Sequence, residues 1–286
     1  MNAMRLQLIL AVLLGLSGLL PLHPVPANAA ETYNFSPVNQ YGISLTAAYW
    51  NPIIDYVSEK SGVRLNLKIG RTSADTTAML LGKEADFAFT NHLFSPDRHH
   101  LGWKVFGRRN TPPIHGALVV PAESPITQLS QLAGAEVGFP GPEATVSYKF
   151  TYAHLLSRGI DVKPVFGGNT DGILAQLFSG RVKAAGVNSQ LMEGYARREN
   201  RPYRIMWQSE PVYDLPLMVS PRVPAHEARA VADAFHGMAK DPRGLEIIRN
   251  ASILVKIPED AWFLPATAKD YSAYFNFFRT APAHLH

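Results

Sequence analysis

The apolar positions along the chain follow two different spacings. In residues 45–60, Trp50, Ile53 and Val57 recur at the three- and four-residue spacing that places side chains on one face of a helix. In residues 63–69, by contrast, apolar and polar side chains alternate one by one. The first pattern predicts an amphipathic helix that packs on a sheet, and the second predicts a half-buried strand.

The same two patterns continue to the C-terminus. The strands that we expect are 33–37, 63–69, 85–90, 114–120, 136–139, 162–166, 182–187 and 211–220. The helices that we expect are 45–60, 72–82, 124–132, 146–157, 171–178 and 189–198, followed by two or three C-terminal helices. Strands that alternate with helices predict an α/β protein with a mainly parallel arrangement of strands.

The chain passes twice between two such series of strands and helices, near residues 115–125 and 211–221. We therefore expect two lobes, one made of residues 30–118 and 216–286 and the other of residues 119–215. Two crossings between lobes form a hinge, and α/β proteins bind ligands at the carboxyl ends of their strands. The order of elements thus predicts a cleft between two lobes that close on each other.

Residues 1–29 are typical of a cleavable export signal. Arg5 precedes an apolar run from Leu6 to Leu20, and Ala27 and Ala29 supply the small residues of a cleavage site. A membrane anchor is the alternative, but a run of about 15 apolar residues is shorter than the roughly 20 that cross a bilayer. The chain has no cysteine to carry a lipid anchor. We expect a signal peptide that is removed on export to the periplasm.

Composition excludes several classes of function. The formal net charge is +4, and the basic residues are dispersed rather than gathered in a stripe, so nucleic-acid binding is not expected. Without cysteine there is no thiol nucleophile, redox pair or cysteine-ligated metal. No nucleophile-elbow, zinc-protease or P-loop motif occurs either. We expect neither an enzyme nor a cofactor-binding protein.

Four segments resemble a known family when taken in order. They are YWNPIIDYVSEKSGV (49–63), TTAMLLGKEADFAFTN (76–91), ESPITQLSQLAGAEVGFPGPEATVSY (123–148) and VFGGNTDGILAQLFSGRVKAAGVN (165–188). Together they resemble the phosphate/phosphite/phosphonate-type periplasmic binding proteins of ABC importers. The resemblance implies a two-lobed type 2 periplasmic-binding fold, with two mixed sheets flanked by helices and a two-crossing hinge. It also implies a small oxyanion as ligand.

The sequence departs from the family pattern at three places. The family's anion-binding Ser-Ser-Thr-Ser run is replaced by 143–146, where only Thr145 keeps a hydroxyl in register and Ser147 lies one position beyond. A histidine of the family is replaced by Thr170, and an aspartate by Lys183. These changes leave the identity of the ligand open.

Thr145 and Ser147 lie where a strand is expected to lead into a helix. The first N–H groups of a helix are unpaired, and with neighbouring hydroxyls they bind an oxyanion without a full counter-charge. Alternatively, Thr145 only caps the helix. Glu143 lies beside them, and its carboxylate is expected to repel a dianion.

Other candidate ligand-binding residues follow the expected strands of the first lobe. Arg71 and Thr72 come after the second strand, and Thr90, Asn91 and His92 come after the third. Arginine pairs well with carboxylate or phosphate, and amide and imidazole groups both donate and accept hydrogen bonds. The alternatives are a surface arginine beside a helix cap, and strand-end residues without contact to a ligand.

In the second lobe, Thr170 and Asn188 lie at the expected strand ends, and Tyr213 is an aromatic candidate from the second crossing. Thr170 is alternatively an N-cap.

A metal site is a further alternative for the histidine-rich stretch that begins at His92. His99 and His100 follow in the same loop with Asp97, but the spacing matches no standard ligand pattern. We therefore expect no metal.

The leading hypothesis is a solute-binding protein that captures a small polar or anionic solute by hinge closure and delivers it to the membrane permease of an ABC importer. The alternative is a periplasmic sensory or accessory subunit whose partner is a membrane kinase or an assembly system. In either case we expect a monomer.

Overall fold

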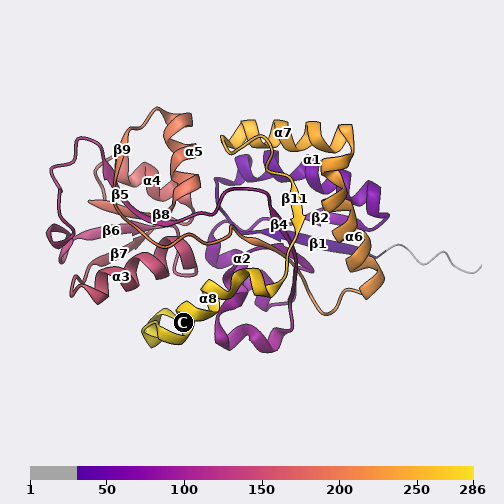
Figure 1. Cartoon of the computed structure of the whole chain (residues 1–286), viewed down its shortest axis with the longest axis horizontal. Coiled ribbons are helices and arrows are strands. Elements are labelled where there is room, and N and C mark those ends of the chain that lie inside the picture. The colour runs from indigo at the N-terminus through magenta and orange to yellow at the C-terminus, as the bar shows by residue number, and fades with distance from the viewer. Residues whose placement is uncertain (1–30) are drawn as a thin grey trace, which may run out of the picture. The chain divides into compact units, whose positions relative to one another are not determined.

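The computed structural model describes residues 31–286 (Figure 1). The export signal predicted for residues 1–29 lies outside the described residues. Two sheets organise the described chain, with strand orders β11-β4-β10-β3-β1-β2 and β7-β6-β8-β5-β9. The first sheet contains β1 (Thr32–Pro37), β2 (Arg64–Leu67), β3 (Phe87–Phe89), β4 (Lys104–Arg109), β10 (Pro216–Val219) and β11 (Phe263–Pro265). The second contains β5 (Gly116–Pro121), β6 (Glu136–Phe139), β7 (Lys163–Phe166), β8 (Ala184–Asn188) and β9 (Tyr203–Gln208).

Both sheets combine parallel and antiparallel strands. In the first, β1 is parallel to β2 and β3, whereas β10 runs antiparallel between β3 and β4. In the second, β6 is parallel to β7 and β8, whereas β5 runs antiparallel between β8 and β9. The predicted fold class, two mixed sheets flanked by helices, is confirmed. The mainly parallel arrangement expected from the alternation of strands and helices is wrong, because β4, β5, β9, β10 and β11 all pair antiparallel.

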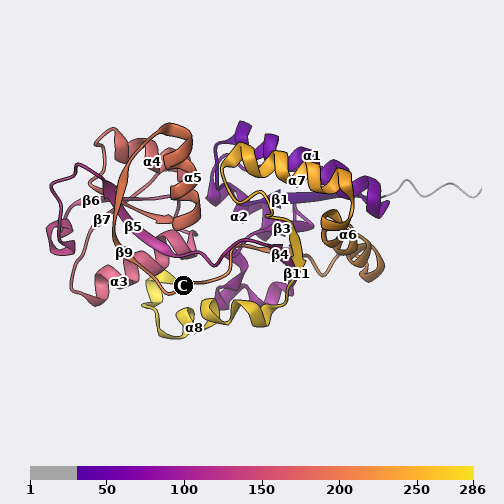
Figure 2. The ribbon, with the colours of Figure 1, turned by 45° about the horizontal axis from the view of Figure 1, so that its top comes forward.

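Helices α1 (Ile43–Ser61), α6 (Ala225–Gly237) and α7 (Pro242–Val255) pack against one another beside the first sheet (Figures 1 and 2). Helix α1 ends at Gly62, whose left-handed φ of 71° lets the chain turn into β2. The predicted apolar stripe of α1 is buried, and Trp50 lies among Phe35, Phe89 and Phe263. Helix α2 (Ser73–Leu81) connects β2 to β3.

The second sheet is flanked by α3 (Thr151–Ser157), α4 (Thr170–Phe178) and α5 (Ser189–Glu199) (Figure 1). The helix predicted for 146–157 exists, but its first part, Thr145–Phe150, is a π-helix that continues into α3. The helix predicted for 124–132 is wrong. Only a 3₁₀ turn forms there, at Leu129–Leu132, after a turn in which the Ser124 N–H donates to the Pro121 carbonyl.

Three strands escaped prediction: β4, β9 and β11. Strands β9 and β11 are edge strands of their sheets, and much of β4 and β9 is only half-buried. Apolar and polar side chains do not alternate regularly in any of the three, so the two-residue spacing that predicts a strand is missing.

Two segments connect the sheets, residues 110–115 between β4 and β5 and residues 209–215 between β9 and β10. They pair with each other through a bridge between Ile114 and Val212. The two-crossing hinge of the predicted fold class is thus present. The lobe boundaries expected after residues 118 and 215 remain a prediction.

The C-terminal helix α8 (Ser272–Thr280) forms a third link. Tyr274 packs on Phe94 near the first sheet, while Phe277 packs on Phe150 at the start of α3. Leu285 is buried in the core of the second sheet. Within residues 31–286, no helix is long and apolar enough to cross a membrane.

Candidate functional site

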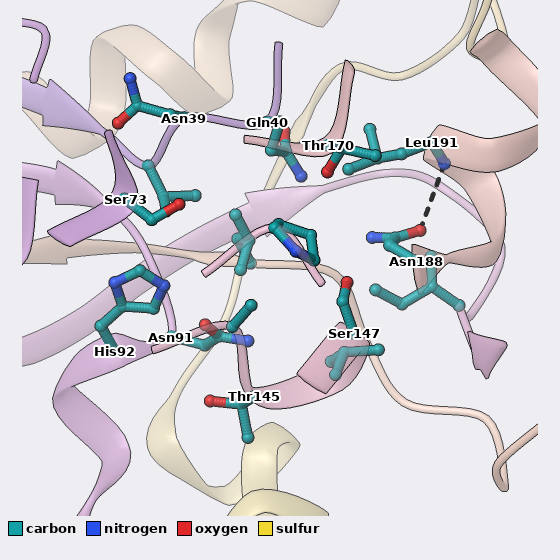
Figure 3. A pocket seen from close by; sticks show the side chains of 16 residues that line it. Asn39, Gln40, Ser73, Asn91, His92, Thr145, Ser147, Thr170, Asn188 and Leu191 are labelled. Carbon is teal, nitrogen blue, oxygen red and sulfur yellow. Dashed lines mark hydrogen bonds between the residues drawn. The ribbon is translucent and has the colours of Figure 1, made fainter. Parts of the chain in front are cut away.

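A cavity of about 50 Å³ lies where strand ends of the two sheets meet (Figure 3). Its walls come from the chain after β1 and β3, the start of α2, both crossings, and the chain after β6, β7 and β8. It is lined by Val38, Asn39, Gln40, Ser73, Asn91, His92, Ile114, Pro140, Ala144, Thr145, Val146, Ser147, Thr170, Asn188, Leu191 and Leu215. This is the position that the order of strands predicted for a ligand cleft.

The structure brings six of the ten sequence-predicted ligand-binding residues together around this cavity. They come from both sheets, and each is buried: Asn91, His92, Thr145, Ser147, Thr170 and Asn188.

The other four predicted residues do not line the cavity. Arg71 is exposed to solvent, and Thr72 caps α2 by accepting a hydrogen bond from the Asp75 N–H. The Thr90 hydroxyl accepts from the His92 N–H, and the ring of Tyr213 lies under the Arg108 guanidinium at 4.2 Å. Local hydrogen bonds or stacking occupy three of these side chains and Arg71 is exposed, so their contact with a ligand stays a prediction.

Sequence reasoning missed the polar residues Asn39, Gln40 and Ser73. Asn39 and Gln40 directly follow β1, so the rule that ligands bind at strand ends was enough to find them. No local signal marks Ser73. It reaches the cavity because α2 packs against the β7–α4 loop, where the Ser73 N–H donates to the Gly168 carbonyl at 3.0 Å.

The Asn188 amide faces the cavity with its donor side. Its Oδ1 accepts from the N–H groups of Gln190 (2.9 Å) and Leu191 (3.3 Å) and so caps α5. Because the oxygen is used in this way, the Nδ2 group points towards the other lining residues (Figure 3). The cap thus provides a hydrogen-bond donor for a ligand.

The start of the π-helix supplies further donors. The first N–H groups of a helix lack intrahelical acceptors, and here they belong to Thr145, Val146 and Ser147. The hydroxyls of Thr145 and Ser147 have no hydrogen-bond partner among the described residues, although both side chains are buried. Since Thr145 makes no cap bond, the alternative that it only caps this helix is not supported. Together these groups suit an oxyanion.

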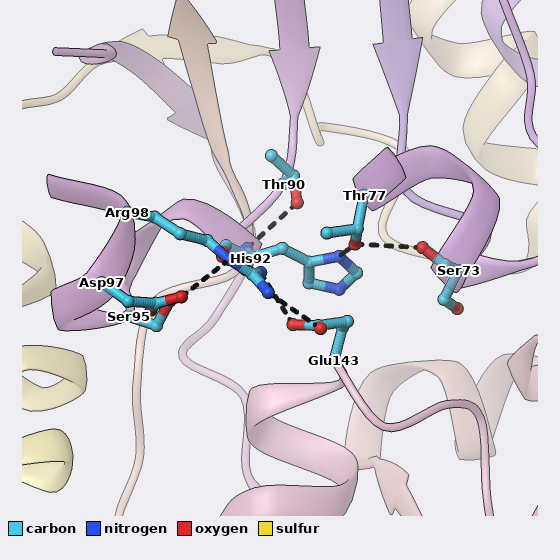
Figure 4. A network of polar contacts seen from close by, with 8 residues as sticks. All are labelled: Ser73, Thr77, Thr90, His92, Ser95, Asp97, Arg98 and Glu143. Carbon is cyan, nitrogen blue, oxygen red and sulfur yellow. Dashed lines mark hydrogen bonds and ion pairs between the residues drawn. The ribbon is translucent and has the colours of Figure 1, made fainter. Parts of the chain in front are cut away.

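Glu143 does not present a free carboxylate to the cavity. Its two oxygens accept from Arg98 Nη1 (2.8 Å) and Nη2 (2.9 Å), and Arg98 also donates to the His92 carbonyl (Figure 4). Burial raises the pKa of Glu143, but the Arg98 hydrogen bonds and charge outweigh this and hold its pKa below the usual value. The ion pair spans the two sheets and neutralises the charge that was expected to repel an anion.

His92 is neutral in the folded protein. It is buried, and its Nδ1 lies 2.8 Å from the Thr77 hydroxyl, which in turn lies 3.1 Å from the Ser73 carbonyl (Figure 4). Burial lowers the pKa of His92 to about 4, and Arg98 and Lys149 contribute in the same direction, against Glu143. No charged side chain therefore lines the cavity among the described residues.

The depressed pKa of His92 predicts a loss of stability in mild acid. Below its ordinary pKa of 6.5, the unfolded chain binds a proton that the folded protein excludes until about pH 4. The free energy of unfolding is expected to fall by about 2 kcal/mol between pH 7 and pH 5 through this group alone. Urea unfolding at both pH values measures the loss.

The control is the His92→Asn variant, because burial also lowers the pKa of His154 and His236. The variant should lose about 2 kcal/mol less than the natural protein over the same interval. Equal losses in the two proteins would show that His92 is not excluded from protonation.

The alternative of a histidine metal site finds no support. Among residues 31–286, no group of three or more histidine, aspartate or glutamate side chains is arranged to hold a metal ion. The ring of His99 instead packs on Phe275, and Asp97 accepts from the Ser95 hydroxyl.

Comparison with known families and structures gives a consistent result. The family model described as "ABC transporter, phosphonate, periplasmic substrate-binding protein" matches residues 35–271. A sequence comparison with curated proteins gives no significant match.

Three solved structures are similar in fold. A binding-protein component of an ABC phosphonate transporter from Pseudomonas aeruginosa has a TM-score of 0.72 at 14% identity, over 87% of this chain and 86% of that one. PhnD1 from Prochlorococcus marinus, in complex with methylphosphonate, has a TM-score of 0.71 at 14% identity, over 87% and 97%. The alkanesulfonate-binding protein SsuA from Xanthomonas axonopodis pv. citri, bound to MOPS, has a TM-score of 0.60 at 12% identity, over 88% and 95%.

Proposed function

Because this chain belongs to the family of periplasmic substrate-binding proteins of ABC phosphonate transporters, we propose that its cavity binds a small organic oxyanion of the phosphonate class. A small-molecule ligand and a membrane permease are the partners that the family implies. We infer the class of the ligand, its position in the cavity and the groups that hold it.

The observation that carries the proposal is the chemistry of the cavity wall. One part of the lining offers donors that carry no net charge: the Asn188 amide, the hydroxyls of Thr145, Ser147 and Thr170, and the first N–H groups of the π-helix. Such groups, at a helix N-terminus, hold an oxyanion without a cationic side chain.

The wall also has an apolar part, which includes Val38, Ile114, Leu191 and Leu215. A ligand with a polar head and a short carbon substituent matches both surfaces, whereas inorganic phosphate leaves the apolar side chains without contact. The cavity is small, at about 50 Å³, which favours a short substituent. Methylphosphonate, which is bound to PhnD1 of Prochlorococcus marinus, has this character.

Contacts between elements of the two sheets support capture by closure. The Ser73 N–H donates to Gly168, Arg98 pairs with Glu143, and Arg198 Nη1 donates to the Val255 carbonyl at 3.2 Å. These contacts join elements of the two sheets, so they break when the two halves move apart. Motion about the two crossings achieves this with little change inside either half.

The same proposal covers the setting in which the protein acts. The chain is exported with the help of residues 1–29, binds its ligand in the periplasm as a monomer and hands it to the permease without chemical change. The donors around the cavity bind and orient the oxyanion and catalyse no reaction.

The test is ligand-dependent thermal stability. A ligand at 100 times its Kd stabilises the folded state by about 2.7 kcal/mol, which for a protein of this size raises Tm by roughly 5 °C or more. We expect methylphosphonate and ethylphosphonate to produce this shift, phosphate a smaller one, and arginine none. A panel in which no oxyanion raises Tm, or in which arginine does so most strongly, would refute the proposal.

A further inference from the structure

Arg109 is a buried arginine that does not itself line the cavity. Only 1% of its surface is exposed, and it is the largest of the side chains buried to this extent. It ends β4, immediately before the first crossing, whereas its partner Asp214 lies in the second crossing. Arg109 Nε donates to Asp214 Oδ2 at 2.8 Å, and Nη2 donates to the same oxygen.

Arg109 also reaches the cavity lining. Its Nη2 donates to Gln40 Oε1 at 3.1 Å, and its guanidinium lies 4.8 Å from the centre of the Phe89 ring and 5.8 Å from that of Tyr49. These hydrogen bonds and ring contacts hold the guanidinium in place. Arg109 therefore connects the two crossings to one residue of the cavity wall.

The contact fixes the orientation of the Gln40 amide. A guanidinium has only hydrogen-bond donors, so the amide atom that faces it has to be the oxygen. The amide is planar, and its NH₂ group then points the other way, towards the cavity, as Figure 3 shows. Gln40 Nε2 has no hydrogen-bond partner among the described residues, although only 7% of the residue is exposed.

We propose that Gln40 is a specificity-determining residue that donates a hydrogen bond to the bound oxyanion, and that Arg109 is a positioning residue that holds Gln40 in this donor orientation. This inference rests on the proposed function and identifies one contact within it. It also gives the buried Arg109–Asp214 pair a role in binding as well as in joining the crossings.

On the opposite wall, the amide of Asn188 is oriented in the same way. There the backbone N–H groups of α5 occupy Asn188 Oδ1 and turn its NH₂ group inward. Gln40 comes from the first sheet side and Asn188 from the second, so two amide donors face the cavity from opposite halves. A ligand that accepts hydrogen bonds from Gln40 and Asn188 together can do so only when the two halves are close. It therefore binds the closed arrangement more tightly and favours it.

The Gln40→Glu variant tests the polarity of this contact. The substitution keeps the shape and an oxygen for Arg109, but it replaces the inward NH₂ group by a carboxylate oxygen. We expect the affinity for methylphosphonate, measured by calorimetric titration, to fall about 100-fold or more. Gln40→Met, which removes the donor without adding charge, should lower it about 10-fold. The matched control is Gln208→Glu, an exposed change of the same kind on β9, which should leave the affinity unchanged.

A double-mutant cycle tests the positioning role of Arg109. Arg109→Lys keeps the positive charge, but a single ammonium group cannot hold Asp214 and Gln40 in the same geometry. It should weaken binding about threefold to tenfold in the natural protein and less than about twofold in the Gln40→Met background. A purely structural role predicts equal effects in both backgrounds. If Arg109→Lys does not fold, the two Gln40 variants still test whether Gln40 donates a hydrogen bond to the ligand.

The outcomes separate this inference from the proposed function. If the natural protein binds no oxyanion, the proposed function fails, and the inference fails with it. If the natural protein binds methylphosphonate and Gln40→Met or Gln40→Glu binds it equally well or better, only the inference is overturned. Reduced binding in both variants, with the coupling to Arg109, supports it.

Discussion

Replacement of Asp214 by alanine is expected to lower the free energy of unfolding by about 3–5 kcal/mol, because it leaves the buried guanidinium of Arg109 without its counter-charge. Both side chains are almost fully buried, and one oxygen of Asp214 already lacks a hydrogen-bond partner among the described residues. Urea unfolding, compared at constant m value, measures the change.

The control for this prediction is a solvent-exposed ion pair of the same protein. Arg181 pairs with Glu136 at the surface, with 57% and 43% of the two side chains exposed. Removal of this pair by Glu136→Ala should cost about 1 kcal/mol or less. Similar costs for Asp214→Ala and Glu136→Ala would contradict the assignment of Arg109 and Asp214 as a buried charge pair that joins the crossings.

Substitution of Gly116 or Gly186 by alanine is expected to reduce the affinity for an oxyanion by more than about 100-fold, since a displacement of about 1 Å is enough to misalign the donors of such a site. A Cβ atom on Gly116 would lie 2.3 Å from the Val146 carbonyl oxygen, and one on Gly186 would lie 2.4 Å from that of Ser147. The two glycines lie on the neighbouring strands β5 and β8. They allow the π-helix to rest directly on the sheet.

The obstruction is backbone, so no side-chain rotation relieves it, and the π-helix has to move away. We expect a stability cost of about 1–3 kcal/mol in addition to the loss of binding. Gly237→Ala is the matched control. Gly237 ends α6 at an ordinary helical φ of −74°, with no atom within 4 Å of a new Cβ, so the change should be neutral or slightly stabilising. Calorimetric titration of all three variants would contradict the account if Gly116→Ala and Gly186→Ala bound as well as Gly237→Ala.

The sequence predicted most of the elements because the pattern of burial repeats along the chain, whereas β4, β9 and β11 were missed. Trp50, Ile53 and Val57 share the buried face of α1, as their spacing predicted. The strand ends of both sheets were also predicted well enough to bring Asn91, Ser147 and Asn188 to one cavity. These inferences depend on local periodicity and on a general rule about strand ends.

The remaining features of the site depend on contacts between residues far apart in the sequence. Glu143 was expected to repel an anion because nothing nearby in the sequence marks Arg98, 45 positions earlier, as its partner. The orientation of Gln40 depends in the same way on Arg109, 69 positions later. Spacing along the chain does not predict such pairs, because each requires two distant loops to meet.

We expect a small organic oxyanion to lie in the cavity between the two sheets, held by uncharged donors from both. A crystal structure of the protein with methylphosphonate tests it most directly. We expect the phosphonate oxygens to lie within hydrogen-bond distance of Gln40 Nε2, Asn188 Nδ2 and the Ser147 hydroxyl, with the methyl group against Leu191 and Leu215. A phosphonate bound outside this cavity, or one held there by a lysine or arginine side chain, would contradict it.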